Sequence, residues 1–150
     1  MKPLIVLLGV FTACLMIVKL TRGTYEIALS ARVALSAMLV FTAIGHFFFT
    51  KGMALMIPQQ VPYKIEIVYI TGVLEIFMAV GLLLENYRVL TAWVLIAFLL
   101  VVLPANIHGA LKNVNYQNAS LDGNSWKYLW FRIPLQLFFI GWTYFAVLRK

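Results

Sequence analysis

The stretch Tyr69-Ile-Thr-Gly-Val-Leu-Glu-Ile-Phe-Met-Ala-Val-Gly-Leu-Leu-Leu84 decides the fold, because it is an apolar run that holds a single carboxylate, Glu75. An ionisable group at the centre of a membrane-spanning helix costs at least about 2.5–3.5 kcal/mol on insertion scales. Such a group usually faces the interior of a helix bundle and has a partner there. The run therefore predicts a membrane helix whose carboxylate is paired or functional.

The composition of the whole chain also indicates a membrane protein. Of its 150 residues, 63% are hydrophobic and 11% are charged, whereas a soluble domain carries about 25% charged residues. The net charge of +7 comes from basic residues that stand singly between apolar runs. This pattern is typical of membrane flanks and argues against nucleic-acid binding. The single cysteine, Cys14, excludes an internal disulfide and a CxxC redox pair.

Five apolar runs approach the length of about 20 residues that spans a bilayer. The first run follows Met1-Lys2 as a signal peptide would, but it continues past Cys14, so we expect an uncleaved helix. The segment Glu85-Asn-Tyr-Arg88 predicts a tight turn and an antiparallel hairpin. We expect one all-α polytopic membrane domain. Its helices cover about residues 3–20, 27–50, 65–84, 89–111 and 126–148.

An odd number of spans places the two termini on opposite sides of the membrane. We call the side that holds the N-terminus side A and the other side B. Five basic residues flank the spans on side A and six on side B. The positive-inside rule therefore leans only slightly toward a cytoplasmic side B. The expected location is the cell (cytoplasmic) membrane.

The polar residues of the last four runs lie at similar depths from side A. At a rise of about 1.5 Å per residue, His46 lies roughly 6 Å from the side-A end of its run. Asn106 and Arg132 lie roughly 8–9 Å in, and Glu75 and Gln136 roughly 15 Å in. The side-B halves of these runs are nearly free of such groups. This asymmetry predicts a site in the side-A half of the bilayer.

Arg132 is the expected partner of Glu75, because a guanidinium cannot practically be neutralised and its fork matches a carboxylate. His46 is the group best able to change protonation near neutral pH. Glu75 and His46 are therefore the candidate catalytic residues, acting by proton transfer. Arg132, Gln136 and Asn106 are the candidate substrate-binding residues.

Two other interpretations fit the same residues. Polar side chains hold membrane helices together, at about 0.6 kcal/mol per hydrogen bond on average, and Asn106 and Gln136 are explained equally well in this way. Two histidines in different runs, His46 and His108, also reach depths compatible with a haem held by both, although haem is the weaker interpretation. Of Asn106 and His108, which are two residues apart, we expect Asn106 to face the bundle centre. No metal site is indicated.

Four short motifs stand in order along the chain: Ala43-Ile-Gly-His-Phe47, Gly72-Val-Leu-Glu75 with Gly81-Leu-Leu-Leu84, Pro104-Ala-Asn-Ile-His108 and Arg132-Ile-Pro-Leu-Gln136. These motifs and their order resemble the DoxX family of small multi-pass membrane proteins. The resemblance covers about residues 32–142 and implies a four-helix membrane bundle. Better-known members are linked to thiosulfate:quinone oxidoreduction or to membrane-associated oxidoreductase complexes. This chain departs from the family by an extra N-terminal transmembrane helix.

These observations give three hypotheses of function. The first is a redox-linked membrane subunit of an oxidoreductase, in which Arg132 and Gln136 bind the carbonyl oxygens of a quinone headgroup. Glu75 and His46 then exchange protons with it, and the electrons come from a soluble or membrane redox partner or from the substrate itself. The second is a small-solute or proton-coupled transporter. The third is a non-catalytic assembly or lipid-binding protein.

Overall fold

The computed structural model describes residues 2–123 and 125–149, with the backbone alone for residues 125–129. Except for an isolated bridge between Asn115 and Ser120, the regular elements of this part of the chain are helices. The ends of the five expected runs differ from the observed ones by at most two residues when α6 and η1 are taken together. The elements are α1 (Lys2–Arg22), α2 (Ile27–Phe48), α3 (Thr50–Ala54), α4 (Lys64–Leu83), α5 (Arg88–Leu111), α6 (Ser125–Thr143) and the π-helix η1 (Tyr144–Leu148).

Five of the described helices are long and apolar enough to cross a membrane: α1, α2, α4, α5 and the helix formed by α6 and η1. Large apolar side chains cover their outer faces, for example Phe77 at 69% and Val101 at 75% exposure. Such a surface suits contact with lipid chains rather than with water. The chain is a multi-pass membrane protein.

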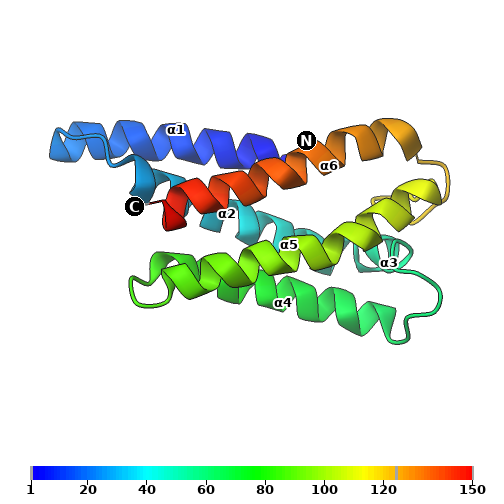
Figure 1. Cartoon of the computed structure of the whole chain (residues 1–150). Helices are drawn as coiled ribbons and strands as arrows, with labels where there is room; N and C mark the ends of the chain where they lie inside the picture. Colours follow the sequence, from blue (N-terminus) through cyan, green and yellow to red (C-terminus); the bar gives the residue numbers. More distant parts are fainter. Residues whose placement is uncertain (1, 124, 150) are drawn as a thin grey trace.

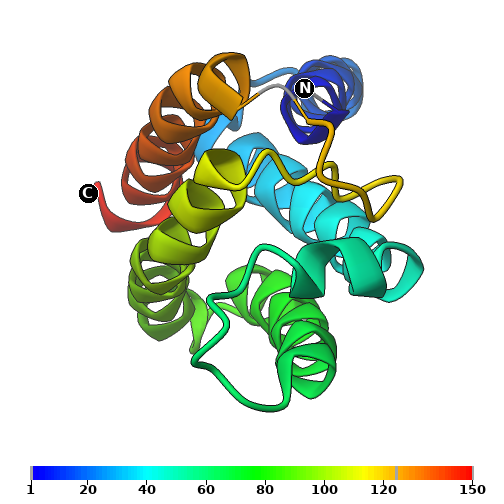
Figure 2. The same cartoon turned by 90° about the vertical axis from the view of Figure 1, so that its right-hand side faces the viewer.

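The spanning helices lie side by side, and α2 is central among them (Figures 1 and 2). It packs most extensively against α4 and α1, while α5 packs against α4 and α6. Helix α1 packs against α2 and places the buried Leu7 in the apolar core that the spanning helices share. The Phe11 ring of α1 meets Trp142 edge-on at 5.1 Å between centroids. The indole N–H of Trp142 donates to the Ala31 carbonyl oxygen at 3.2 Å, which ties α6 to α2.

The apolar core lies in the side-B half of the bundle. Leu35 and Leu39 of α2, Leu82 of α4 and Leu95 of α5 are almost fully buried there. The turn between α4 and α5 forms as expected, with the Arg88 N–H donating to the Leu84 carbonyl oxygen at 2.9 Å. Polar side chains are buried in the side-B half as well, those of Ser30, Ser36 and Thr143, so the asymmetry expected from the sequence does not extend to hydroxyl groups.

The second expected run ends earlier than predicted, because α2 stops at Phe48 and the chain turns into α3. The Thr50 hydroxyl donates to the carbonyl oxygens of His46 at 2.7 Å and Phe47 at 3.0 Å. A threonine that bonds to the carbonyls of the preceding turn competes with the regular helical hydrogen bonds. Thr42 makes the same kind of bond inside the unbroken part of α2, so the Thr50 bond accompanies the break and does not cause it alone. The break places α3 at the side-A end of the bundle (Figure 1).

Helix α3 is held by the loop that follows α5. A Cβ atom added at Gly52 would lie 1.8 Å from the Tyr116 carbonyl oxygen, so the two backbones touch where Gly52 has no side chain. The Nδ1 of His108 lies 3.0 Å from the Met56 carbonyl oxygen. A carbonyl oxygen can only accept, so His108 donates and fixes the turn after α3 to α5.

Candidate functional site

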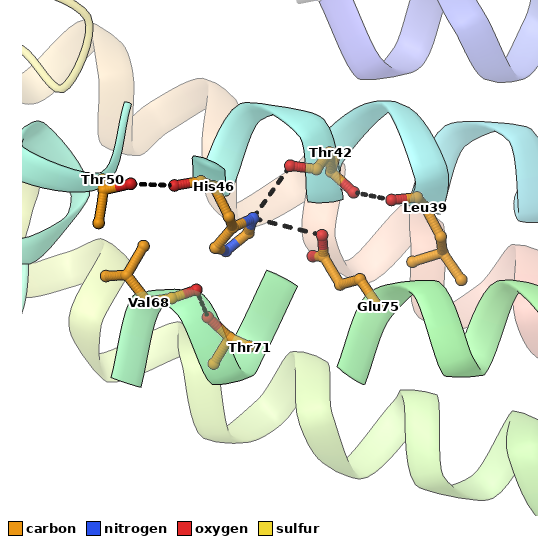
Figure 3. Close-up of polar contacts among 7 residues, drawn as sticks. All are labelled: Leu39, Thr42, His46, Thr50, Val68, Thr71 and Glu75. Atoms are coloured by element: carbon orange, nitrogen blue, oxygen red, sulfur yellow. Dashed lines mark hydrogen bonds and ion pairs between the residues drawn. The ribbon is translucent and has the colours of Figure 1, made fainter. Parts of the chain in front are cut away.

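Glu75 of α4 and His46 of α2 meet inside the bundle. The Nδ1 of His46 lies 3.3 Å from the Oε2 of Glu75, and the two side chains are 16% and 8% exposed (Figure 3). Both residues lie in membrane-spanning helices, where an ionisable group needs a partner. The structure therefore gives the carboxylate a histidine partner on the helix that packs most closely against α4.

The antiparallel course of α2 and α4 explains how the two side chains reach each other. A helical side chain tilts toward the N-terminus of its own helix. Glu75 therefore leans toward side A and His46 toward side B, so they approach along the membrane normal. A Cβ atom at Gly72 would lie 2.9 Å from the His46 Cβ, which puts His46 level with Gly72, one turn from Glu75. His46 thus lies farther from side A than its position in the sequence indicates, because α4 begins farther toward side A than α2 ends.

The hydrogen bonds around the pair fix the proton on one nitrogen of His46. Its Nδ1 lies 3.0 Å from the Thr42 carbonyl oxygen, which can only accept, so Nδ1 carries a hydrogen (Figure 3). That hydrogen points at Thr42, and the buried Oε2 of Glu75 has no partner with hydrogen-bond geometry. Gain and loss of a proton by His46 therefore take place at Nε2.

The neighbouring threonines supply no donor to the carboxylate. The hydroxyl of Thr42 donates to the Leu39 carbonyl oxygen at 3.0 Å, and that of Thr71 to the Val68 carbonyl oxygen at 2.8 Å (Figure 3). Thr50 likewise donates to the main chain of its own segment, as described above. Each hydroxyl donates to a main-chain carbonyl oxygen of its own segment. Glu75 Oε2 therefore remains a buried acceptor without a hydrogen bond.

Asn106 and Gln136 form a second polar contact, between α5 and α6. The Asn106 amide donates to Gln136 Oε1 at 3.3 Å, and the Gln136 amide donates to the Leu99 carbonyl oxygen. Pro104 lacks an N–H and so frees a carbonyl one turn earlier in α5, beside Leu99. Gln136 thus binds main chain exposed near a proline. The structure gives both amides a protein partner, and their role in substrate binding stays a prediction.

Arg132 of α6 lies near the pair. It is partly buried, and it is close enough to His46 for the two charges to interact. The expected contact between Arg132 and Glu75 stays a prediction, whereas His46 is the partner that the structure assigns to the carboxylate. Of the five predicted site residues, the structure brings His46 into contact with Glu75 and Asn106 into contact with Gln136, and it places Arg132 near His46.

The other histidine, His108, is engaged elsewhere through its bond to Met56 at the side-A end. Asn106 is 5% exposed and His108 is only partly buried, so Asn106 faces the bundle interior as predicted. Each histidine directs its Nδ1 at a main-chain carbonyl oxygen, and a haem held by both would use their Nε2 atoms.

An open hollow of about 340 Å³ lies at the side-A end of the bundle, and its lining includes neither His46 nor Glu75. We call it the aromatic hollow, because the rings of Phe47 and Tyr69 lie together in its wall at 5.8 Å between centroids. Phe47 follows His46 directly, and Tyr69 lies one turn before Gly72. Sequence reasoning missed this feature, although Tyr69 shares the Gly72 face at helical spacing. It is lined by Phe47, Phe48, Phe49, Thr50, Lys51, Gly52, Tyr69, Tyr116, Gln117, Asn118 and Ala119.

Comparison with known families matches residues 35–147 to a family described as "Domain of unknown function (DUF8561)". The chain belongs to this family. The DUF8561 region runs from within α2 to η1 and leaves α1 outside it. All the candidate residues and the aromatic hollow lie within the DUF8561 region. No curated protein and no solved structure matches the chain.

Proposed function

We propose that the protein is a redox-linked membrane subunit in which His46 and Glu75 exchange protons with a lipid-borne quinone headgroup. The observation that carries the proposal is the buried His46–Glu75 contact, 3.3 Å long. The aromatic hollow at the side-A end, which Phe47 lines directly after His46 in the chain, supports it. Reduction of a quinone takes up two electrons and two protons and gives a quinol. A proton donor inside the bilayer is therefore what this chemistry requires of the protein.

The geometry supports a defined role for each partner. The Nδ1–H of His46 is held by the Thr42 carbonyl oxygen, so Nε2 is the position that gives a proton to a quinone oxygen and regains it. The Glu75 carboxylate stabilises the imidazolium form of His46. Arg132 lies nearby and favours an anionic intermediate on the ligand. The electrons for this reduction come from a redox partner protein or from the substrate itself.

The aromatic hollow is the proposed entrance for the ring of the ligand. The flat rings of Phe47 and Tyr69 suit contact with a quinone ring, and aromatic pairs of this kind contribute about 0.5–1.5 kcal/mol beyond the area they bury. Gln117 and Asn118 line the same hollow and carry amide donors for carbonyl oxygens. A ligand from the lipid would meet the hollow first and the His46–Glu75 pair next.

The test is binding of a short-chain ubiquinone to the detergent-purified protein, together with mass spectrometry of molecules that the protein retains. We expect saturable binding that weakens at least tenfold in Tyr69→Ala. The matched control is Phe77→Ala, which removes an aromatic ring from the outer face of α4, 69% exposed. Reduction of the bound quinone to quinol, with its uptake of two protons, should be slower in Glu75→Gln, because the carboxylate no longer stabilises the imidazolium form of His46. Equal binding by Tyr69→Ala and Phe77→Ala would overturn the proposal.

A second candidate, proton-coupled transport, is favoured by the depth of the carboxylate. Glu75 lies 11 residues after Lys64, the first residue of α4, or about 16 Å along the helix axis. This is near the middle of a hydrocarbon core about 30 Å thick, where transporter sites lie. Liposomes with a trapped pH-sensitive dye distinguish the two candidates. Proton flux that requires Glu75 and needs no quinone supports transport.

A further inference from the structure

A second hollow of about 430 Å³ lies at the side-A end between α3 and the start of α4. Its wall carries Lys51 of α3 and Lys64, the first residue of α4, together with the carboxylate of Glu66. The remaining lining is apolar and consists of Ala54, Leu55 and Ile65. We call it the lysine hollow.

The first turn of α4 adds partial positive charge to the lysine hollow. The residue before the helix, Tyr63, has a left-handed backbone with φ of 54° and gives no side-chain cap. The first regular bond there is from the Ile67 N–H to the Tyr63 carbonyl oxygen, at 3.0 Å. The N–H groups of the three preceding residues therefore have no acceptor within the helix. Two lysines and a helix N-terminus outweigh the single carboxylate of Glu66, so the charge of the hollow favours an anion.

The position of the hollow selects the kind of anion. The membrane-spanning part of α2 ends at Phe48 and that of α4 begins at Lys64, so the hollow lies at the boundary where phospholipid headgroups are found. Leu55 and Ile65 of its lining are 42% and 48% exposed. They provide an apolar surface for the upper part of an acyl chain. A soluble anion would use the charges but leave this surface uncovered.

We infer that the lysine hollow binds an anionic glycerophospholipid, with the phosphodiester between Lys51 and Lys64 and an acyl chain along Leu55 and Ile65. The carboxylate of Glu66 favours a headgroup that carries hydroxyl donors, so phosphatidylglycerol is the preferred class. This site is separate from the His46–Glu75 pair, and it stands whether or not the protein binds a quinone.

The test is native mass spectrometry of the purified full chain, titrated with phosphatidylglycerol and, in parallel, with phosphatidylcholine. We expect a tightly retained phosphatidylglycerol and no comparable retention of phosphatidylcholine. Each interfacial lysine contributes about a fivefold factor to attraction of an anionic lipid, so Lys51→Gln/Lys64→Gln should bind about thirtyfold more weakly. The matched control is Lys112→Gln, which removes a lysine from the same side outside the hollow.

The charge-preserving variant Lys51→Arg/Lys64→Arg separates lost binding from lost folding, and it should keep the affinity within about threefold, because both positions stay cationic. A free phosphate would bind without the acyl chain. Saturable binding of inorganic phosphate with the same affinity would therefore overturn the lipid assignment. Equal retention of both lipids, or unchanged affinity in Lys51→Gln/Lys64→Gln, would also overturn it.

Discussion

His46 and Glu75 face each other across the α2–α4 contact with Nδ1 and Oε2 3.3 Å apart, and the hydrogen on Nδ1 is directed at the Thr42 carbonyl oxygen. The two members of this pair are therefore not equivalent. His46 keeps a hydrogen bond when it is neutral, whereas Glu75 Oε2 has no hydrogen bond in the described structure. Replacing His46 and replacing Glu75 should therefore change the free energy of unfolding by different amounts.

We expect His46→Leu to lower the free energy of unfolding more than Glu75→Gln does. In Glu75→Gln, neutral His46 still donates to Thr42, so the loss should stay below about 1 kcal/mol. In His46→Leu, the buried Glu75 loses its partner, which costs about 1–3 kcal/mol. Chemical unfolding in detergent measures the change in the free energy of unfolding for each variant.

The surface variant Glu85→Gln, in the turn before α5, is the control for loss of a carboxylate and should unfold like the unmodified protein. The double variant His46→Leu/Glu75→Leu should recover stability relative to His46→Leu, because an apolar pair often replaces a buried ionic pair without loss. Equal stability of His46→Leu and Glu75→Gln would contradict the asymmetry that we describe.

The close approach of α2 and α4 at Gly72 gives a second prediction. A Cβ atom there would lie 2.9 Å from the His46 Cβ and 3.5 Å from the Ala43 carbonyl oxygen. Gly72→Ala should therefore push the helices apart and cost about 1–3 kcal/mol. It should also disturb the His46–Glu75 contact and reduce quinone binding.

Gly141→Ala is the matched control, because a Cβ atom at Gly141 has no atom within 4 Å. Alanine is a better helix former than glycine by about 1 kcal/mol, so this control should be neutral or slightly stabilising. Thermal unfolding in detergent compares the two variants. If Gly72→Ala is as stable as Gly141→Ala, the two helices are not packed as tightly as the structure shows.

The contact between α5 and α6 at Gln136 gives a third prediction. Gln136→Leu removes two hydrogen bonds, to Asn106 and to the Leu99 carbonyl oxygen. At about 0.6 kcal/mol for each bond in a membrane, the loss should be about 1 kcal/mol. The control is Leu137→Ala, on the outer face with 60% exposure, which should change stability less. If Gln136→Leu instead abolishes ubiquinone binding at full stability, Gln136 contacts the ligand, as the sequence analysis expects.

The positions of the spanning helices were predictable because length and hydropathy alone determine them. The structure places His46 against Gly72, where the missing side chain lets α2 and α4 approach closely. Charge reasoning alone favoured Arg132 as the partner of Glu75. The histidine partner was not predicted, because the relative height of α2 and α4 depends on the break at Phe49 and on where α4 begins.

Two parts of the site were beyond the reach of sequence patterns. The Gln136 amide donates to the main-chain carbonyl oxygen of Leu99. Every residue has such an oxygen, so the type of residue does not show which one accepts the bond. The aromatic hollow includes Tyr116, which lies in an irregular loop and is positioned by contact with the Gly52 backbone. Contacts between loops depend on tertiary packing, and no helical or strand periodicity reports them.

The last prediction concerns the tie between α5 and the turn after α3. His108 donates to the Met56 carbonyl oxygen at 3.0 Å, so His108→Leu should leave that acceptor unpaired and cost about 1 kcal/mol. The segment between α3 and α4 should then open more often, and trypsin should cleave faster after Lys51 and Lys64. Leu137→Ala, on the outer face of α6 with 60% exposure, is the control for cleavage, because it leaves this tie and the bundle interior in place. Unchanged cleavage in His108→Leu, with haem retained by the unmodified protein and lost in both His108→Leu and His46→Leu, would instead support the haem interpretation of the two histidines.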